Sequence, residues 1–400
     1  MTRQEVMKKV LDGKLTGRQA AALLGLTERH VRRLRRKAER GGVQELVDGR
    51  AGRPRRRRIR QETMDELFRL RRELYRDFSI RHFYEFATEK HGLAISYTKT
   101  RMALQEVGLA HKGASRGKHR RRRPRRPMLG MMMHLDASMH RWLKRRRHQD
   151  LVVMQDDATS QILFAQFFEQ EGVMSTLSAL HHVLTRHGRF SELYTDRASH
   201  FCNTQIAKSG PDQIQQGTVP LALKALGIRQ IWARSPQARG RSERTFGTLQ
   251  GRLPQELALA GVQTYEQANQ YLRDVFVPAY NRRFAVQPAQ PEAAFTSLDG
   301  LELELLLSIQ HERIVRNDNT VLFRKTVFQL PPSDHRMHYV RCQVLVHEFV
   351  NGDLGVSYQG SLLGRFSQGG ELKTELRYGK RRRIAYLDPE ASSKGVPVWR

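Results

Sequence analysis

The sequence predicts a multidomain α+β protein, with helical domains at its start, a mixed sheet with helices in the middle and a small β module near its end. Three observations favour this organisation. The length of 400 residues suits roughly two to four domains. Two strongly basic runs divide the chain. Beyond residue 130 the apolar residues change from helical spacing to short strand-like runs.

Composition excludes several classes of protein. The 70 Lys and Arg residues against 40 Asp and Glu give a formal charge of +30, which favours polyanions such as nucleic acid. No apolar run approaches the roughly 18 residues of a membrane span, and the first residues lack a secretory apolar segment. Two cysteines are too few for a disulfide scaffold. We expect an intracellular protein that meets nucleic acid and no membrane.

The basic runs lie at residues 53–58 and 118–127. Like charges repel and proline breaks helices, so each run is expected to be an extended linker. A solvated loop without a partner is the alternative, but an arm along a phosphate backbone is favoured, with contacts from Arg55, Arg56, Arg57, Arg121, Arg122 and Arg123. The expected divisions are helical domains 1–50 and 61–112, linkers 51–60, 113–128 and 286–310, a core 129–285, a β module 311–365 and a basic tail 366–400.

The first domain has the pattern of a helix-turn-helix. A capping box at residues 16–19 begins a helix over Gly17–Leu24, Gly25 supplies a tight turn, and Thr27 caps a second helix with a basic outer face. Any basic two-helix hairpin could share this pattern, but a recognition helix for the DNA major groove is favoured. The side chains expected to contact DNA are Arg29, Arg32, Arg33 and Arg36.

A second, weaker helix-turn-helix pattern follows. Residues 61–76 and 79–90 are amphipathic, and Ser96 can cap a helix that ends near Glu106. The last helix carries fewer charges than its counterpart in the first domain. Two such domains would allow one chain to recognise a long asymmetric site.

The middle of the chain alternates strands and helices. The expected elements are strands 131–135, 151–154 and 162–168, helix 173–186, strand 190–195, helix 219–226, strand 228–233 and a helix from Ser242 to Leu253. The order β-β-β-α-β-α-β-α indicates a mixed sheet flanked by helices. In such sheets, functional residues collect at strand ends and in the loops that follow.

Three acidic residues are candidates for chemistry in this sheet. Asp136 and Asp196 each end a predicted strand, and Glu243 lies at the margin of the apolar stripe of the last helix. Mg²⁺ takes oxygen ligands from few carboxylates, and a metal pair stabilises the attacking and leaving oxygens of an in-line phosphoryl displacement. Acids at strand ends also cap helices or pair with arginine, so spacing alone does not establish a metal site.

Other residues near the three acids are expected to have structural or DNA-binding roles. Asp156 and Asp157 are expected to close a strand into its turn, and His134 to pack beside the site. Phosphate contacts are expected from arginines around the start of the last helix, namely Arg239, Arg241 and Arg244.

The local context of the acids resembles a known family. The segments are His134-Leu135-Asp136, Asp156-Asp157-Ala158-Thr159, residues 194–201 (YTDRASHF) and residues 235–249 (SPQARGRSERTFGTL). Together they resemble the integrase core of DDE transposases, in particular the bacterial insertion-sequence group called ISNCY. The resemblance covers about residues 1–360 and is most specific around Glu243.

The resemblance implies a ribonuclease-H-like core and a transposase that cuts and joins DNA. Asp136, Asp196 and Glu243 match the family's catalytic, metal-binding triad, which implies two Mg²⁺ (or Mn²⁺) ions per site and no nucleotide cofactor. The expected partners are double-stranded DNA of the element ends and target, and further copies of the chain in at least a dimer. The expected location is the bacterial cytoplasm, at the nucleoid. The chain departs from retroviral integrases in its longer 196–243 spacing and in lacking a His/Cys cluster, so no structural zinc is expected.

Two other functions share these features. A transposase-derived regulator would bind DNA without cutting it, although three intact acids favour the enzyme. A structure-specific nuclease would share the fold, but the helix-turn-helix domains argue against it.

The last third is expected to finish the core and then form a separate module. Residues 264–284 read as a helix with an apolar stripe. Short alternating segments with turns between them indicate an SH3-like antiparallel barrel, from strands 313–315, 321–330, 339–346 and 356–358.

Overall fold

The computed structural model describes residues 2–46, 59–111, 123–143, 147–201, 217–233, 239–298, 300–332 and 336–375. The chain divides into two compact units, one of residues 1–70 and 87–100 and the other of residues 71–86 and 101–400. Five expected DNA contacts in the basic runs lie outside the described residues, namely Arg55, Arg56, Arg57, Arg121 and Arg122.

The N-terminal domain is a small helical bundle. Its elements are α1 (Arg3–Leu11), α2 (Gly17–Leu24), α3 (Glu28–Gly41) and a 3₁₀ turn, η1 (Val43–Leu46). The capping box is confirmed, because the Thr16 hydroxyl accepts from the Gln19 amide at 3.3 Å and the Gln19 side chain accepts from the Thr16 amide at 2.9 Å. Gly25 ends α2 with a φ of 62°, a left-handed conformation that glycine adopts at little cost.

Three further helices follow, α4 (Gln61–Glu73), α5 (Ile80–Glu89) and α6 (Tyr97–Glu106). The buried guanidinium of Arg71 donates to the backbone carbonyls of Tyr75 and Phe78, both at 2.6 Å. This side chain therefore satisfies two carbonyls in the turn between α4 and α5.

The core contains a five-stranded mixed sheet in the order β3-β2-β1-β4-β5. The strands are β1 (Met132–His140), β2 (Gln149–Asp156), β3 (Ile162–Phe168), β4 (Glu192–Thr195) and β5 (Arg229–Trp232). The first three form an antiparallel meander, while β4 is parallel to both β1 and β5. The predicted mixed sheet is confirmed, and the expected strands 151–154 and 162–168 pair as a hairpin within it.

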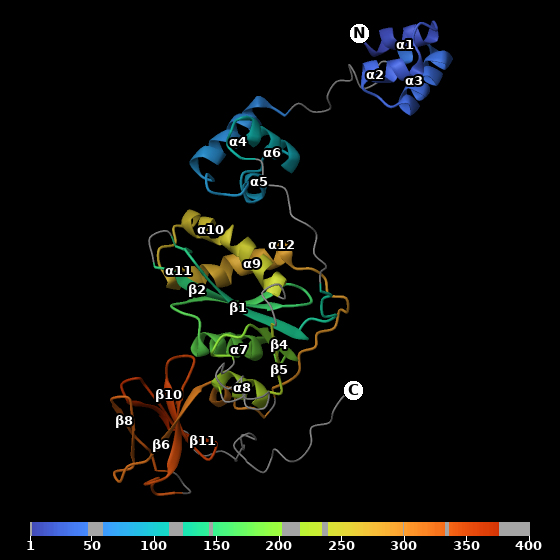
Figure 1. Cartoon of the computed structure of the whole chain (residues 1–400). Coiled ribbons are helices and arrows are strands. Elements are labelled where there is room, and N and C mark those ends of the chain that lie inside the picture. Colours follow the sequence, from blue (N-terminus) through green and yellow to red (C-terminus); the bar gives the residue numbers. More distant parts are fainter. Residues whose placement is uncertain are drawn as a thin grey trace, which may run out of the picture. The chain divides into compact units, whose positions relative to one another are not determined.

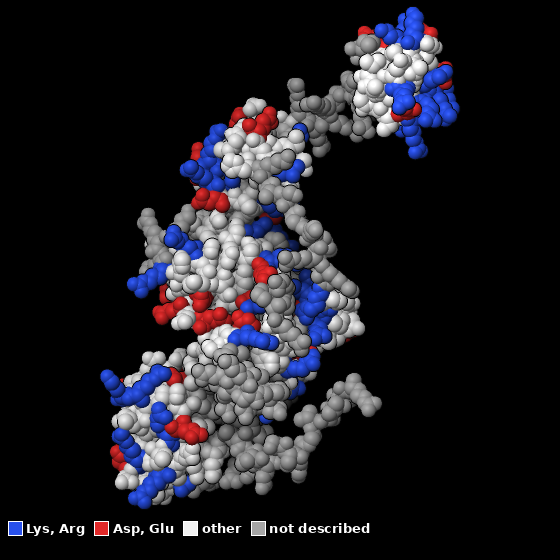
Figure 2. All heavy atoms as spheres, viewed as in Figure 1, with Lys and Arg blue, Asp and Glu red and all other residues white. Residues whose placement is uncertain are grey.

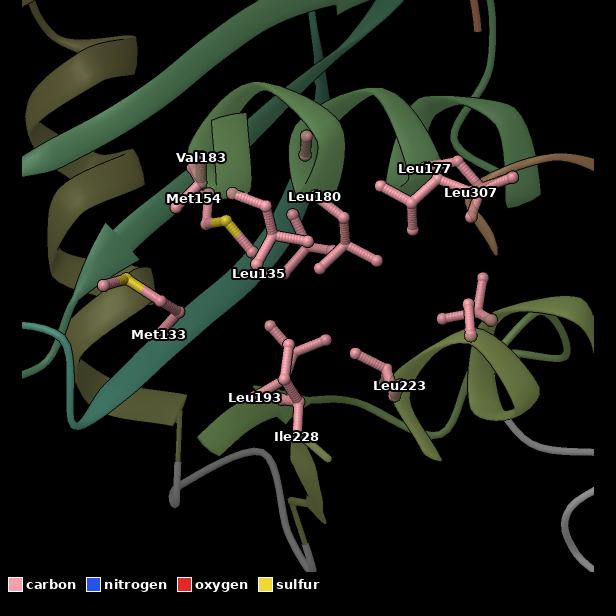
Figure 3. Close-up of a cluster of buried hydrophobic side chains, with 14 of the residues drawn as sticks. Met133, Leu135, Met154, Leu177, Leu180, Val183, Leu193, Leu223, Ile228 and Leu307 are labelled. Atoms are coloured by element: carbon pink, nitrogen blue, oxygen red, sulfur yellow. The ribbon is translucent and has the colours of Figure 1, made fainter. Parts of the chain in front are cut away.

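Helices cover both faces of this sheet (Figure 1). One face packs against α7 (Val173–His187) and α8 (Thr218–Ala225). The other packs against a helical series made of α9 (Gly240–Gln250), α10 (Leu253–Leu259), α11 (Tyr265–Tyr271), a π-helical turn η5 (Leu272–Phe276) and α12 (Val277–Phe284). Figure 3 shows the first of these cores, in which Leu180 of α7 lies beside Leu135 of β1 and Leu177 lies beside Leu307.

Two sequence-based boundaries in the core are wrong. Strand β1 does not end at Asp136 but continues to His140, because its ladder with β2 runs on through the pair His140↔Gln149. The expected linker 286–310 is partly core: it contains the short helix α13 (Leu303–Leu306), and Leu306 and Leu307 are buried against the sheet. Because these leucines are far from the strands of the sheet in the sequence, no local pattern predicted that they pack against it.

The outer edge of the sheet is closed by side chains rather than by another strand. Asn281 of α12 accepts from the Ile162 amide at 2.8 Å and donates to the Ile162 carbonyl at 2.9 Å. Asn269 of α11 pairs with both backbone groups of Phe167 in the same way, at 2.7 and 3.3 Å. Each asparagine thus satisfies a residue of the edge strand β3, whose free backbone groups would otherwise invite another strand.

The C-terminal module is not the closed barrel that was expected. Its strands are β6 (Ile309–Ile314), β7 (Thr320–Phe323), β8 (Thr326–Gln329), β9 (Gln343–Glu348), β10 (Leu354–Tyr358), β11 (Ser361–Phe366) and β12 (Leu372–Glu375). Among the described residues they form an open sheet, β12-β11-β10-β9-β6, and a separate two-stranded sheet, β7-β8. The expected strand 321–330 is therefore a hairpin, which turns at Arg324 with a φ of 51°.

No helix in the described part of the chain is both long and apolar enough to cross a bilayer.

Candidate active site

Two of the three predicted acids lie side by side in the sheet. Strands β1 and β4 are parallel and adjacent, with His134 opposite Tyr194. Asp136 and Asp196 each follow one of these partners by two residues, so they share a level and a face of the sheet. The topology therefore brings together two carboxylates that are 60 positions apart in the sequence.

Both carboxylates converge on one arginine. The guanidinium of Arg239 forms an ion pair with Asp136 through one nitrogen and with Asp196 through another, the latter at 2.8 Å. The Arg239 and Asp136 side chains are only 17% and 15% exposed, whereas Asp196 is 34% exposed. A largely buried cation thus lies between the two acids.

The environment of Asp136 disfavours its charge. Burial raises the pKa of Asp136 to about 6, although the Arg239 charge and the polar side chain of Ser242 oppose that shift, and the carboxylates of Glu171 and Asp196 reinforce it. One guanidinium therefore does not fully offset the cost of placing this carboxylate beside other acids in a buried position.

Helix α9 is held to the sheet by polar contacts on its inner face. The Thr245 hydroxyl donates to the Gln155 side chain of β2 at 2.7 Å, and Gln250 donates to the Ser138 hydroxyl of β1 at 2.9 Å. Phe246 and Leu249 of the same face are buried in the core. The start of α9, which carries Arg239 at its N-cap, is thus fixed near the acid pair.

Glu243 does not join the acid pair in this structure. The buried neighbour Ser242 faces the sheet, and Glu243, one residue or about 100° further round the helix, is exposed. Within the ranges that the structure describes, no group of three or more His, Cys, Asp or Glu side chains is placed to hold a metal ion. The expected convergence of three acids is therefore reduced here to two.

A second charged cluster, centred on Asp157, was not predicted from the sequence. The fully buried Asp157 carboxylate accepts from His134 Nε2 at 2.7 Å and from the Arg126 amide at 2.7 Å. It also pairs with Arg123 at 2.5 Å and with Arg241. Asp157 therefore ties the start of α9 and the end of the second basic run to β1.

The electrostatics of this cluster favour a charged Asp157. Burial alone would raise the pKa of Asp157, but the hydrogen bonds from His134 and Arg126 and the charge of Arg241 hold that pKa well below the ordinary aspartate range. Burial lowers the pKa of His134. His134, which was expected to pack beside the site, is buried and bonds to Asp157.

Asp156 has the turn-closing position predicted for it. One of its carboxylate oxygens accepts from both the amide and the hydroxyl of Thr159, at 2.7 and 2.8 Å, and the other accepts from the Gly130 amide at 3.1 Å. With all these bonds made to the backbone and one threonine, Asp156 is a structural residue.

The expected DNA-contacting arginines fall into two groups. Arg29, Arg32, Arg33 and Arg36 are exposed on α3, opposite the buried Val31 and Leu34, and Figure 2 shows basic side chains gathered on the N-terminal domain. Around the core, Arg244 is exposed. Arg123 and Arg241, by contrast, pair with the buried Asp157, and Arg239 pairs with Asp136 and Asp196.

Comparison with family models and solved structures places these features among known proteins. A family model described as a winged helix-turn helix matches residues 3–65. The catalytic core of the HTLV-2 integrase, in a complex with magnesium, is 15% identical, with a TM-score of 0.27 over 36% of this chain and 82% of that one. A simian T-cell lymphotropic virus intasome is 12% identical, with a TM-score of 0.33 over 67% and 91%.

Two curated relatives cover most of the chain. The transposase for insertion sequence IS1202 of Streptococcus pneumoniae is 25% identical along an alignment of 385 positions, which covers 87% of this chain and 82% of that protein. The y4bF protein of Sinorhizobium fredii (strain NBRC 101917 / NGR234), also named as a transposase, is 32% identical over 367 residues, 91% of this chain and 79% of that protein. At this identity and coverage, the chain belongs to the family of these bacterial transposases.

Proposed function

We propose that this transposase binds the ends of an insertion element and catalyses metal-dependent cleavage and joining of DNA strands, with Asp136, Asp196 and Glu243 as a DDE triad. The observation that supports this most is the convergence of Asp136 and Asp196 on one cationic group. Two carboxylates on adjacent parallel strands form a site that demands positive charge.

The chemistry of the aspartate pair fits a divalent ion. Both carboxylates already share a stand-in cation, the Arg239 guanidinium, and carboxylate oxygens are the ligands that Mg²⁺ and Mn²⁺ prefer. Glu243 would complete the set by turning from solvent toward the pair. Two such ions, when bound, would stabilise charge on the attacking and leaving oxygens.

The proposed reaction has two displacements at phosphorus. In the first, water attacks a phosphodiester at the element end, the P–O3′ bond breaks, and the 3′ oxygen leaves as a hydroxyl. In the second, that 3′ hydroxyl loses its proton and attacks a phosphodiester of the target, whose own 3′ oxygen leaves and takes up a proton. The second step makes one phosphodiester bond for each that it breaks, so it needs no nucleotide cofactor.

The exposed arginines of α3 would hold the element end. Arg29, Arg32, Arg33 and Arg36 lie on one helix of a domain that matches a winged helix-turn helix model, and such a helix suits the major groove. Because transposition brings two ends together, we propose at least a dimer on double-stranded DNA. The site of action would be the bacterial cytoplasm, at the nucleoid.

One observation favours a second candidate, a transposase-derived regulator that binds DNA without cutting it. Glu243 is exposed, and the described residues hold no three-acid cluster. In that case the Arg239 pairing would be a permanent structural ion pair.

A nicking and joining assay separates the two candidates. The substrate is the DNA that flanks this gene in its host, incubated with the wild-type protein in Mg²⁺ and, in parallel, with an excess of EDTA. Site-specific nicks and joined products that disappear with EDTA are expected from the transposase. Specific binding to the element ends without cutting under either condition would support the regulator.

A further inference from the structure

We propose that Arg239 is a placeholder cation, which holds Asp136 and Asp196 together before metal binds and must leave them when metal arrives. The inference rests on the proposed metal-dependent function and adds a residue that controls entry to the site. Arg239 would thus be a positioning residue in competition with metal, and not only a contact for DNA phosphate.

The geometry makes the two occupants mutually exclusive. The guanidinium forms ion pairs with a carboxylate oxygen of Asp136 and a carboxylate oxygen of Asp196. The Arg239 side chain is only 17% exposed in this position. A divalent ion bound between the same carboxylates would need those oxygens and would repel the guanidinium at contact distance. Metal binding therefore has to displace Arg239.

The helix does not depend on this ion pair for its position. The Arg239 backbone carbonyl accepts from the Ser242 hydroxyl at 3.0 Å, and Arg241 ties the same turn to Asp157. Further along α9, Thr245 bonds to Gln155. The Arg239 side chain can therefore swing out of the site while α9 stays in place.

Displacement would also give the guanidinium a new partner. Arg239 is at the N-cap of α9, and the exposed Arg244 follows five residues later on the same helix. A freed guanidinium near a DNA strand finds phosphate, the anion that arginine binds bidentately. Loading of metal and contact with DNA would in this way be coupled through one side chain.

The test measures Mn²⁺ affinity of the full chain without DNA, by titration calorimetry. Arg239→Gln removes the competitor and is expected to bind Mn²⁺ about tenfold more tightly than wild type, within the range typical of coupled sites. Arg239→Lys keeps the positive charge and should stay close to wild type. Arg229→Gln, which breaks the Arg229–Glu192 ion pair of the same core, is the matched control and should leave the affinity unchanged.

Thermal melting provides a second readout. Without metal, Arg239→Gln should melt lower than wild type, because the two carboxylates lose their shared cation, and Mn²⁺ should raise its melting temperature more than that of wild type. A purely structural arginine would instead give a variant that binds Mn²⁺ equally or more weakly, which would overturn the inference.

Asp136→Asn distinguishes failure of the inference from failure of the proposed function. If wild type binds Mn²⁺ in an Asp136-dependent manner but Arg239→Gln binds no more tightly, the placeholder is refuted and the metal site stands. If no variant shows Asp136-dependent binding, the metal site itself is refuted and the placeholder with it.

Discussion

At the scale of single residues, Glu243 is the sharpest test of the proposed triad. We expect Glu243→Gln to lower cleavage at least about a hundredfold, because loss of a metal ligand removes several kcal/mol of transition-state stabilisation. Binding to element ends, measured by anisotropy, should stay within a few fold of wild type. Thr248→Ala, on the same helix and with its hydroxyl bonded to the Arg244 carbonyl, is the control for α9. Normal cleavage by Glu243→Gln would show that Glu243 is not part of the catalytic site, while the proposal for the aspartate pair would still stand.

Asp157 gives a prediction about stability rather than chemistry. Asp157→Asn leaves the largely buried Arg241 and the buried His134 without their carboxylate, so we expect a loss of about 3–5 kcal/mol in unfolding free energy. Denaturant unfolding at pH 7 measures it. Asp318→Asn, at an exposed aspartate of the C-terminal module, is the comparison and should change little.

The same variant has a defined pH dependence. The folded-state pKa of Asp157 is lowered, so its stabilisation is fully present above the unfolded pKa, about 3.9, and is lost as pH falls through the folded value. The stability difference between wild type and Asp157→Asn should be constant from pH 6 to 8 and shrink below about pH 4. A difference that grows on acidification would contradict the assigned ion pairs.

The sequence predicted the positions of some site residues and missed the partners of others. Partners that are far apart along the chain leave no local pattern in the sequence. Asp136 and Asp196 could be paired because each belongs to a predicted strand, and adjacent strands bring their ends together. The partners of Asp157 come from residues 123, 126, 134 and 241. No local sequence pattern predicts that these residues come together. Asp157 was therefore expected to close a turn, and Arg239 was expected to contact DNA phosphate.

At the scale of elements, the asparagines on α11 and α12 protect the edge of the sheet. Each bonds both backbone groups of one residue in β3. We expect Asn281→Ala to cost about 1–3 kcal/mol of stability, because it leaves buried backbone groups of Ile162 unpaired. Thermal melting and light scattering together test this, since an open edge should also promote association.

Elements with local signals were predicted well. Threonine caps and Gly25 mark α2 and α3, and short apolar runs mark the β2–β3 hairpin. The turn between β7 and β8 lies at Arg324 and Lys325, which lack the Gly, Asn or Pro that usually announces a turn. In the expected helix 264–284, Val275 belongs to the π-helical turn η5 and is exposed.

At the scale of the whole molecule, DNA binding and catalysis should be separable by mutation. Arg32 and Arg36 are exposed on α3, whereas the acids described above belong to the other compact unit. We expect Arg32→Ala with Arg36→Ala to weaken end binding and to reduce the slope of log affinity against log salt by about one for each lost phosphate contact. A titration from 50 to 200 mM salt (about the range in which such slopes are steep) measures this. An unchanged slope would exclude α3 from phosphate contact.

Some features of the domain organisation could be predicted from the sequence, and others could not. Basic runs and a change of period separated helical domains from a mixed sheet, because charge and periodicity are local properties. Whether strands close into a barrel depends on how the last strand meets the first. The C-terminal module therefore proved to be an open sheet with a hairpin, in place of the expected barrel.

The most direct test of the central claim is strand cleavage by Asp196→Asn, with binding to the same element-end DNA measured in parallel. Asp196 shares its cation with Asp136, so the account predicts cleavage reduced at least about a hundredfold in Mg²⁺, with binding within a few fold of wild type. Cleavage at the wild-type rate by this variant would contradict the assignment of the aspartate pair as the catalytic centre.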